Sequence, residues 1–116
     1  MLAPRLSIRI DGHTVNLAVS GPLATADHAA ALATVCDHLP DGAGLVVNLS
    51  GVTVLTEAGL RGLRAIAATL AATGTRVAFV CSELLMRAEL VLADLDQLAP
   101  VLPADEEAVA LVDRAA

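Results

Sequence analysis

Two stretches near the beginning of the chain, residues 5–10 and 13–20, alternate polar with apolar side chains. An alternation of period two is typical of a β-strand that has one buried face. The Asp11-Gly12 pair between the two stretches favours the tight turn of a hairpin. The pattern therefore predicts an N-terminal antiparallel β-hairpin, which we expect to end at Gly21-Pro22.

The spacing of apolar residues becomes helical in the next segment. Between residues 25 and 39 the apolar side chains recur at intervals of three and four, and Thr25 precedes them as a candidate N-cap. Pro40-Asp41-Gly42 then interrupts the pattern. These features predict a helix over residues 25–39.

Two continuous apolar runs follow, Leu45–Leu49 and Val77–Cys81. Such runs are typical of strands that are buried on both faces in a parallel sheet. Between them the sequence predicts a helix over residues 57–73, with Gly74 as the residue that follows its end. Strand, helix and strand together form a βαβ unit, which we expect to cross over with the right-handed sense.

The last part of the chain predicts three short elements. A short helix is expected over residues 84–92, and the apolar residues 99–102 predict an edge strand because prolines at 100 and 103 confine it there. A final helix is expected to begin near Ala104, where the acidic residues 105–107 suit the positive end of its dipole. The chain of 116 residues has the length of one domain, and the order of elements predicts the α/β class.

The composition is unusually apolar, with 56% hydrophobic residues, which raises the question of a membrane protein. The apolar stretch 45–56 is interrupted by Asn48, Ser50 and Gly51, and falls short of the roughly 20 residues that a spanning helix needs. The N-terminal residues lack the apolar core of a signal peptide. We therefore expect a cytoplasmic protein that does not insert into a membrane.

The charges argue against direct binding of nucleic acid. The formal net charge is −6 and the chain has no lysine, whereas binding to a phosphate backbone needs several cations on one face.

The remaining chemistry-bearing residues favour structural roles. Cys36 and Cys81 lie in apolar surroundings, which predicts buried free thiols; a redox-regulated disulfide is the alternative and would require a Cα separation below about 7 Å. The three histidines are scattered and lack the spacing of a metal site. No serine has a nearby histidine and carboxylate in a catalytic arrangement. We expect a non-enzymatic protein without a metal or another cofactor.

The segment Asn48–Leu60, N-L-S-G-V-T-V-L-T-E-A-G-L, contains the end of a predicted strand, a polar loop over residues 50–56 and the start of a helix. It resembles the signature of STAS domains, the family of bacterial anti-sigma factor antagonists, which is roughly D-L-S-G-V-x-x-x-D-S-S-G-L. Three further segments resemble the family in the same order, namely Ser20–Leu23, Leu70–Val80 and Leu90–Leu98. The resemblance implies a single STAS domain over residues 1–116, in which a β-hairpin joins a mixed sheet of four to five strands with about four helices.

The resemblance also identifies a regulatory position. In the family, the serine after the second aspartate is phosphorylated by a partner kinase, and Glu57 stands at that position here. Glu57 has three interpretations. In the first, it serves only as a cap and a negative charge at the helix N-terminus; in the second, it replaces phosphoserine and holds the protein in the state released from its partner. In the third interpretation, the chain has no kinase control and binds its partner constitutively. Thr56 and Ala24 replace two family aspartates that commonly face the partner. We therefore expect the chain to be insensitive to the family kinase.

The resemblance implies a docking surface formed by the loop 50–56 and the helix 57–73. Gly59 and Gly62 are expected to flatten one face of this helix, and Arg61 and Arg64 place two cations beside it unless they are ordinary solvated residues. Arg61 also follows Glu57 by four residues, which favours an ion pair. The residues expected to contact the partner are Ser50, Gly51, Thr53, Thr56, Glu57, Ala58, Gly59, Arg61 and Arg64.

Two kinds of partner fit the resemblance. The first is a GHKL-type anti-sigma factor kinase, whose capture would regulate sigma-factor-dependent transcription. The second is an ABC ATPase, because T-E-A-G-L shares its ending with the D-T-A-G-L motif of a small STAS subunit in phospholipid-trafficking ABC complexes. A scaffold role in a larger STAS assembly, binding of a small ligand and self-association are further alternatives.

Overall fold

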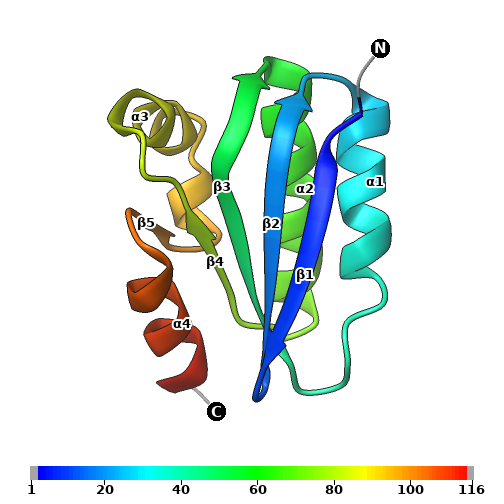
Figure 1. Cartoon of the computed structure of the whole chain (residues 1–116), viewed down its shortest axis with the longest axis vertical. Coiled ribbons are helices and arrows are strands. Elements are labelled where there is room, and N and C mark those ends of the chain that lie inside the picture. The colour runs from blue at the N-terminus through cyan, green and yellow to red at the C-terminus, as the bar shows by residue number, and fades with distance from the viewer. Residues whose placement is uncertain (1–2, 115–116) are drawn as a thin grey trace.

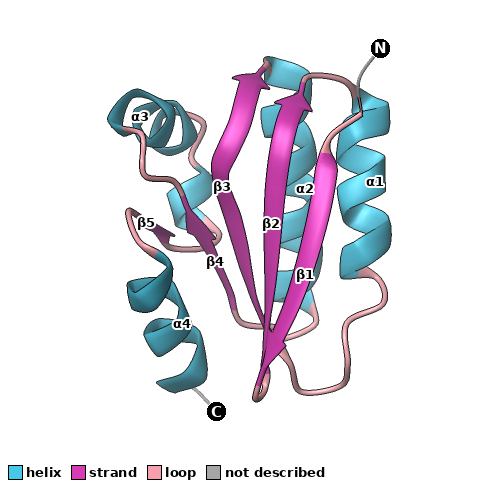
Figure 2. Ribbon diagram, in the orientation of Figure 1, coloured by secondary structure: helices cyan, strands magenta, loops and turns pink. Residues whose placement is uncertain are grey.

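The computed structural model describes residues 3–114, and within them a five-stranded sheet forms the centre of the molecule. Its strands lie in the order β1-β2-β3-β4-β5, with β1 antiparallel to β2 and all other neighbours parallel. The elements in chain order are β1 (Arg5–Asp11), β2 (Thr14–Leu23), α1 (Ala26–Cys36), β3 (Gly44–Leu55), α2 (Glu57–Ala72), β4 (Val77–Val80), α3 (Leu84–Leu92), the 3-10 turn η1 (Leu95–Gln97), β5 (Val101–Leu102) and α4 (Asp105–Arg114). Figure 1 and Figure 2 show this arrangement.

Helices cover both faces of the sheet, so the molecule has three layers. On one face, α1, α2 and the α3–η1 segment pack on a large apolar core that includes Leu17, Val47 and Phe79. On the other face, α4 packs through Ala108 and Val112 onto the alternate residues of β3 and β4. The central strands are buried on both faces, as their continuous apolar runs predict.

Most of the expected elements are confirmed. The hairpin, the two parallel strands and the helices over residues 57–72, 84–92 and 105–114 are all present. Thr25 caps α1, and Gly74 follows the end of α2 with a positive φ of 77°, the backbone conformation that glycine tolerates best. The helix predicted over residues 25–39 ends three residues early, at Cys36. The final edge strand, β5, has only two residues and lies between Pro100 and Pro103.

Two expectations about the ends of β2 and β3 are wrong. Gly21-Pro22 does not end β2, which continues to Leu23, and residues 50–55 are not a loop but the second half of β3. The two segments pair with each other from Ser20 with Gly51 to Leu23 with Leu55. The pairing has two register shifts, and at each of them β3 has one residue more than β2, first between Asn48 and Gly51 and then between Val52 and Val54.

Candidate functional site

The candidate site lies where β3 ends and α2 begins. Thr56 is the N-cap of α2, and its hydroxyl oxygen accepts a hydrogen bond from the backbone N–H of Gly59 at 3.3 Å. The same hydroxyl donates to the backbone carbonyl of Ala24 at 2.8 Å, just beyond the end of β2. The backbone N–H of Thr56 donates to the carbonyl of Leu23. Thr56 therefore joins the helix start to two strand ends.

Gly59 reinforces this junction by close packing. It is buried, and a Cβ atom at this position would lie 2.0 Å from the carbonyl oxygen of Leu23. Gly62, one turn later, lies against α1, where a Cβ would meet the Cβ of Ala29 at 2.2 Å. The expectation that these glycines flatten an outer docking face is therefore wrong, because they allow close approach inside the protein. Gly59 can act on a partner only through the position of the helix.

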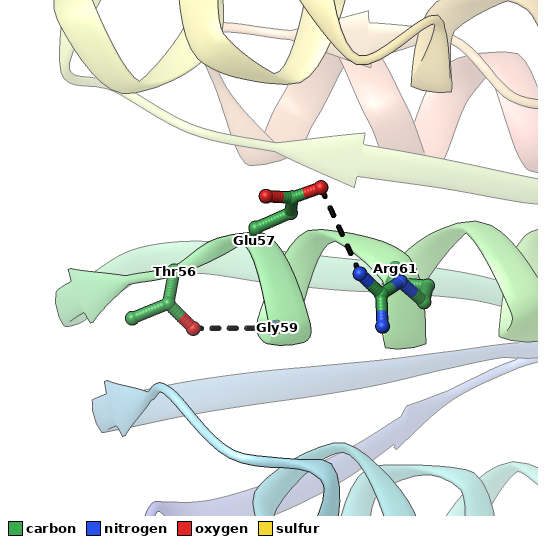
Figure 3. Close-up of polar contacts among 4 residues, drawn as sticks. All are labelled: Thr56, Glu57, Gly59 and Arg61. Atoms are coloured by element: carbon green, nitrogen blue, oxygen red, sulfur yellow. Dashed lines mark hydrogen bonds and ion pairs between the residues drawn. The ribbon is translucent and has the colours of Figure 1, made fainter.

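Glu57 has the opposite environment. Its side chain is 88% exposed and forms an ion pair of 3.7 Å with Arg61, whose side chain is 76% exposed. Figure 3 shows Glu57 pointing away from the side on which Thr56 meets Gly59. The expected pair between positions 57 and 61 is confirmed, and at such exposure it contributes only about 0.2–0.5 kcal/mol. The carboxylate therefore remains available to another molecule.

The middle of β3 makes polar contacts of its own. The Ser50 hydroxyl accepts from the backbone N–H of Ser82 at 3.2 Å, and the Ser50 N–H donates to the side-chain carbonyl of Asn48 at 2.9 Å. The Asn48 amide in turn donates to the carboxylate of Asp105 at 3.0 Å, at the first residue of α4. The middle of β3 is thereby tied to the residues after β4 and to the start of α4.

The roles of Asn48, Ser82 and Asp105 in these contacts could not be predicted from the local sequence. Asn48 was visible as the first residue of the motif, where the family has an aspartate, but its partner lies 57 residues away. Buried His28 was also missed as part of this region: its Nδ1 atom accepts from the backbone N–H of Ala24 at 3.1 Å. This contact fixes the turn after β2, to which Thr56 is bonded.

The residues that the sequence predicts to contact a partner differ in accessibility. They follow each other along the end of β3 and the first two turns of α2. The exposed ones are Ser50, Gly51, Thr53, Glu57, Arg61 and Arg64; Thr56 and Ala58 are half-buried, and Gly59 is buried. The charged members of the exposed set are one anion, Glu57, and two cations, Arg61 and Arg64.

The two cysteines are buried free thiols, as predicted. Burial raises the pKa of Cys36 to about 11, and the negative charge of Asp37 adds to this effect. Burial also raises the pKa of Cys81. Both thiols are therefore protonated at neutral pH and are weak nucleophiles.

Two further observations concern the described part of the chain. Its His, Cys, Asp and Glu residues form no group of three or more that could hold a metal ion. None of its helices is both long enough and apolar enough to cross a membrane.

The fold and the motif together define the class of protein. The chain begins with a hairpin that joins a mixed sheet, and a capped helix starts where two parallel strands end. This is the architecture that the STAS resemblance implies. Residues 6–103 match the family described as "Mlab, STAS domain", and the chain belongs to this family. No curated protein matches the chain by sequence.

Solved structures of STAS domains have the same fold. An anti-sigma factor antagonist from Mycobacterium paratuberculosis is 24% identical, with a TM-score of 0.78 over 96% of this chain and 95% of that one. A serine-to-glutamate variant of RsbS from Moorella thermoacetica is 16% identical, with a TM-score of 0.79 over 96% and 97%. The STAS domain of a SulP transporter from Vibrio cholerae is 18% identical, with a TM-score of 0.67 over 92% and 88%. At these identities the likeness establishes the fold.

Proposed function

We propose that this chain is a non-enzymatic protein-interaction module of the anti-sigma factor antagonist type. The partner of such a module is a GHKL-type anti-sigma factor kinase in the cytoplasm, and in this chain Glu57 keeps the module released from that kinase, which sets sigma-factor-dependent transcription. The observation that carries the proposal is the exposed Glu57 carboxylate on a helix start whose inner side is fixed by Thr56 and Gly59. An interaction module needs this combination, because a rigid platform lets a partner recognise one exposed group at low entropic cost.

Glu57 occupies the position that the resemblance assigns to phosphoserine. A carboxylate at a helix N-terminus is stabilised by the helix dipole, as a phosphate would be, but it carries less charge and cannot be removed. Glu57 therefore places the chain permanently in the partner-released state of a phosphorylated antagonist. Thr56 does not replace the missing serine, because its hydroxyl is half-buried and makes two hydrogen bonds.

The first experiment is affinity capture from lysate of the source organism with the wild-type chain, Glu57→Ser and Glu57→Ala, followed by mass spectrometry. We expect both variants, but not the wild type, to capture a GHKL-type kinase. Incubation of that kinase with ATP should phosphorylate Glu57→Ser and leave the wild type unmodified. Stoichiometric phosphate on Thr53 or Thr56 of the wild type would contradict the proposal.

Arg61 tests the position of the docking surface. With the captured kinase and Glu57→Ala as the parent, we expect Arg61→Glu to weaken binding more than tenfold, or about 1.4 kcal/mol. Arg61→Gln removes the charge without reversing it and should have a smaller effect. Unchanged affinity for Arg61→Glu would remove this side of α2 from the interface.

A second candidate function is an accessory subunit that docks constitutively on an ABC ATPase. The retained Ala58-Gly59-Leu60 sequence favours it, and the matching family description is not that of an antagonist. Under this alternative, all three forms would capture the same ATPase equally well, and Glu57 would only charge the helix start.

A further inference from the structure

The edge strand β1 presents an apolar face without a cover. Ile8 and Ile10 are 53% and 65% exposed, although they alternate with polar residues and lie on the same face as half-buried Leu6. Their partners on β2 are Leu17 and Val15, which belong to the buried core. The core face of the sheet therefore continues outward onto β1 and stops at exposed isoleucines.

The backbone of β1 is equally open. The sheet order gives β1 one neighbour, β2, and no other segment of the described chain pairs with its outer side. Seven consecutive residue pairs join β1 to β2 without a register shift, so no bulge bends the strand away. β1 also contains no proline, which is one common protection of an exposed edge.

We propose that β1 is a homodimer interface, in which the β1 strands of two copies pair antiparallel around a two-fold axis at Ile8. Antiparallel pairing of one strand with itself satisfies the two-fold symmetry of most homodimers. It would join the two sheets and place the exposed isoleucines of both copies side by side on one face. The occupant of the open edge is thus a second copy of this chain.

The charges of β1 select this register. When the pairing is centred on Ile8, all seven residues of β1 lie opposite residues of the second copy's β1. Arg5 of each copy then lies opposite Asp11 of the other, which gives two equivalent pairs. A register centred on Ser7 would oppose Arg5 to Arg9, and one centred on Arg9 would oppose Arg9 to itself. Among the described residues, Arg5, Arg9 and Asp11 form no ion pair within the chain. Their charges are therefore available to the second copy.

The contact is short, because seven strand residues span only about 23 Å. It belongs to the class of small interfaces, below roughly 1,200 Å², and the dimer should be in exchange with monomer. Sedimentation equilibrium of the wild-type chain from about 10 µM to about 1 mM should therefore show concentration-dependent dimerisation. A wild type that stays monomeric over this range would overturn the proposal.

A charge exchange tests the register. Within one chain, Arg5 and Asp11 face the uncharged Ser20 and Thr14, so exchanging them leaves the hairpin pairs neutral. We expect Arg5→Asp to weaken dimerisation about tenfold, and Arg5→Asp with Asp11→Arg to restore it. Arg64→Asp makes the same change in net charge on α2 and should leave dimerisation unchanged. Equal losses in Arg5→Asp and Arg64→Asp, or no restoration by the exchange, would show that β1 does not pair in this register.

A cross-link gives an independent measurement. Ile8→Cys places two thiols opposite each other on the two-fold axis, whereas Cys36 and Cys81 are buried. Mild oxidation should therefore convert Ile8→Cys to a covalent dimer. Leu92→Cys, at a position that is 83% exposed on α3, is the control and should cross-link slowly. Equal rates for the two variants would indicate random collision and contradict the proposed interface.

Discussion

The two sides of the start of α2 differ in how much of the protein depends on them. On the inner side, the Thr56 hydroxyl makes two hydrogen bonds and Gly59 leaves no space for a methyl group beside Leu23. On the outer side, Glu57 makes one long ion pair with Arg61 and is otherwise solvated. The inner side sets the position of the helix, and the outer side can change without changing the fold. Substitutions on the first side should alter stability, and substitutions on the second should alter binding.

The largest effect is expected at Gly59. The added methyl group of Gly59→Ala would collide with a backbone carbonyl, so we expect a loss of about 2–3 kcal/mol in the free energy of unfolding, even after the gain of about 1 kcal/mol in helix propensity. Urea unfolding followed by circular dichroism measures it.

Gly62 provides the matched control for this prediction. Gly62→Ala collides with the side chain of Ala29, so Ala29→Gly should recover most of its loss. No side-chain change can relieve the collision at Gly59. A Gly59→Ala protein as stable as the wild type would show that the helix start can shift, and the inner side would not be rigid.

The next effect is expected at the cap. Thr56→Ala removes the acceptor for Gly59 and the donor to Ala24, and should cost about 1–2 kcal/mol. Thr56→Ser keeps the hydroxyl and should retain most of the stability. The midpoints of thermal unfolding compare the three proteins. If the alanine and serine variants lose the same stability, the methyl group and not the hydroxyl holds the junction.

Another effect concerns a second inward-facing group, the Cys36 thiol, and appears only at alkaline pH. Its folded pKa of about 11 lies above the ordinary value of 9.0. The resulting stabilisation is complete below about pH 9 and is lost as the pH rises toward 11, because the unfolded chain then releases the proton more readily. The chain has no tyrosine and no lysine, so few other groups titrate in this interval.

Thermal unfolding at pH values from about 8 to 11 tests the thiol. The melting temperature of the wild type should fall more steeply than that of Cys36→Ala, and the remaining slope should reflect Cys81, whose pKa is raised in the same direction. Parallel curves for the two proteins would mean that Cys36 does not contribute.

The smallest effect on stability is expected on the outer side. Glu57→Ala removes one exposed ion pair and one favourable charge at a helix start, so the loss should stay below about 1 kcal/mol and shrink with added salt. Glu57→Gln isolates the charge from the side-chain length. Urea unfolding at low and high salt measures both. A loss as large as that of Thr56→Ala would mean that Glu57 belongs to the scaffold, and the contrast between the two sides would disappear.

Much of the fold could be predicted from local patterns in the sequence. Alternation specified the hairpin, continuous apolar runs specified the central parallel strands, and Thr25, Thr56 and Gly74 marked helix ends through their own chemistry. The extension of β3 over residues 50–55 could not be predicted in this way. Ser50, Gly51 and Thr53 suit a loop by composition, and only the pairing of this segment with residues 20–23, through Gly51, Val52, Val54 and Leu55, makes it a strand.

The site divides in the same manner. The Thr56 cap, the exposed Glu57 and its ion pair with Arg61 depend only on residues within four positions of each other. They could therefore be predicted from the local sequence. The role of Gly59 depends on the carbonyl of Leu23, 36 residues earlier, and no local pattern distinguishes a glycine that flattens a surface from one that allows close approach. The contact of Asn48 with Asp105 has the same long-range origin.

The brevity of β5 limits how far the sheet can grow. Its two residues lie between Pro100 and Pro103, and a proline offers no N–H to an incoming strand. Fibril-like stacking requires that every added molecule presents a fresh edge. If two copies joined through β1, the outer edges of the combined sheet would be the two short β5 strands. Association would therefore stop at two molecules and could not propagate.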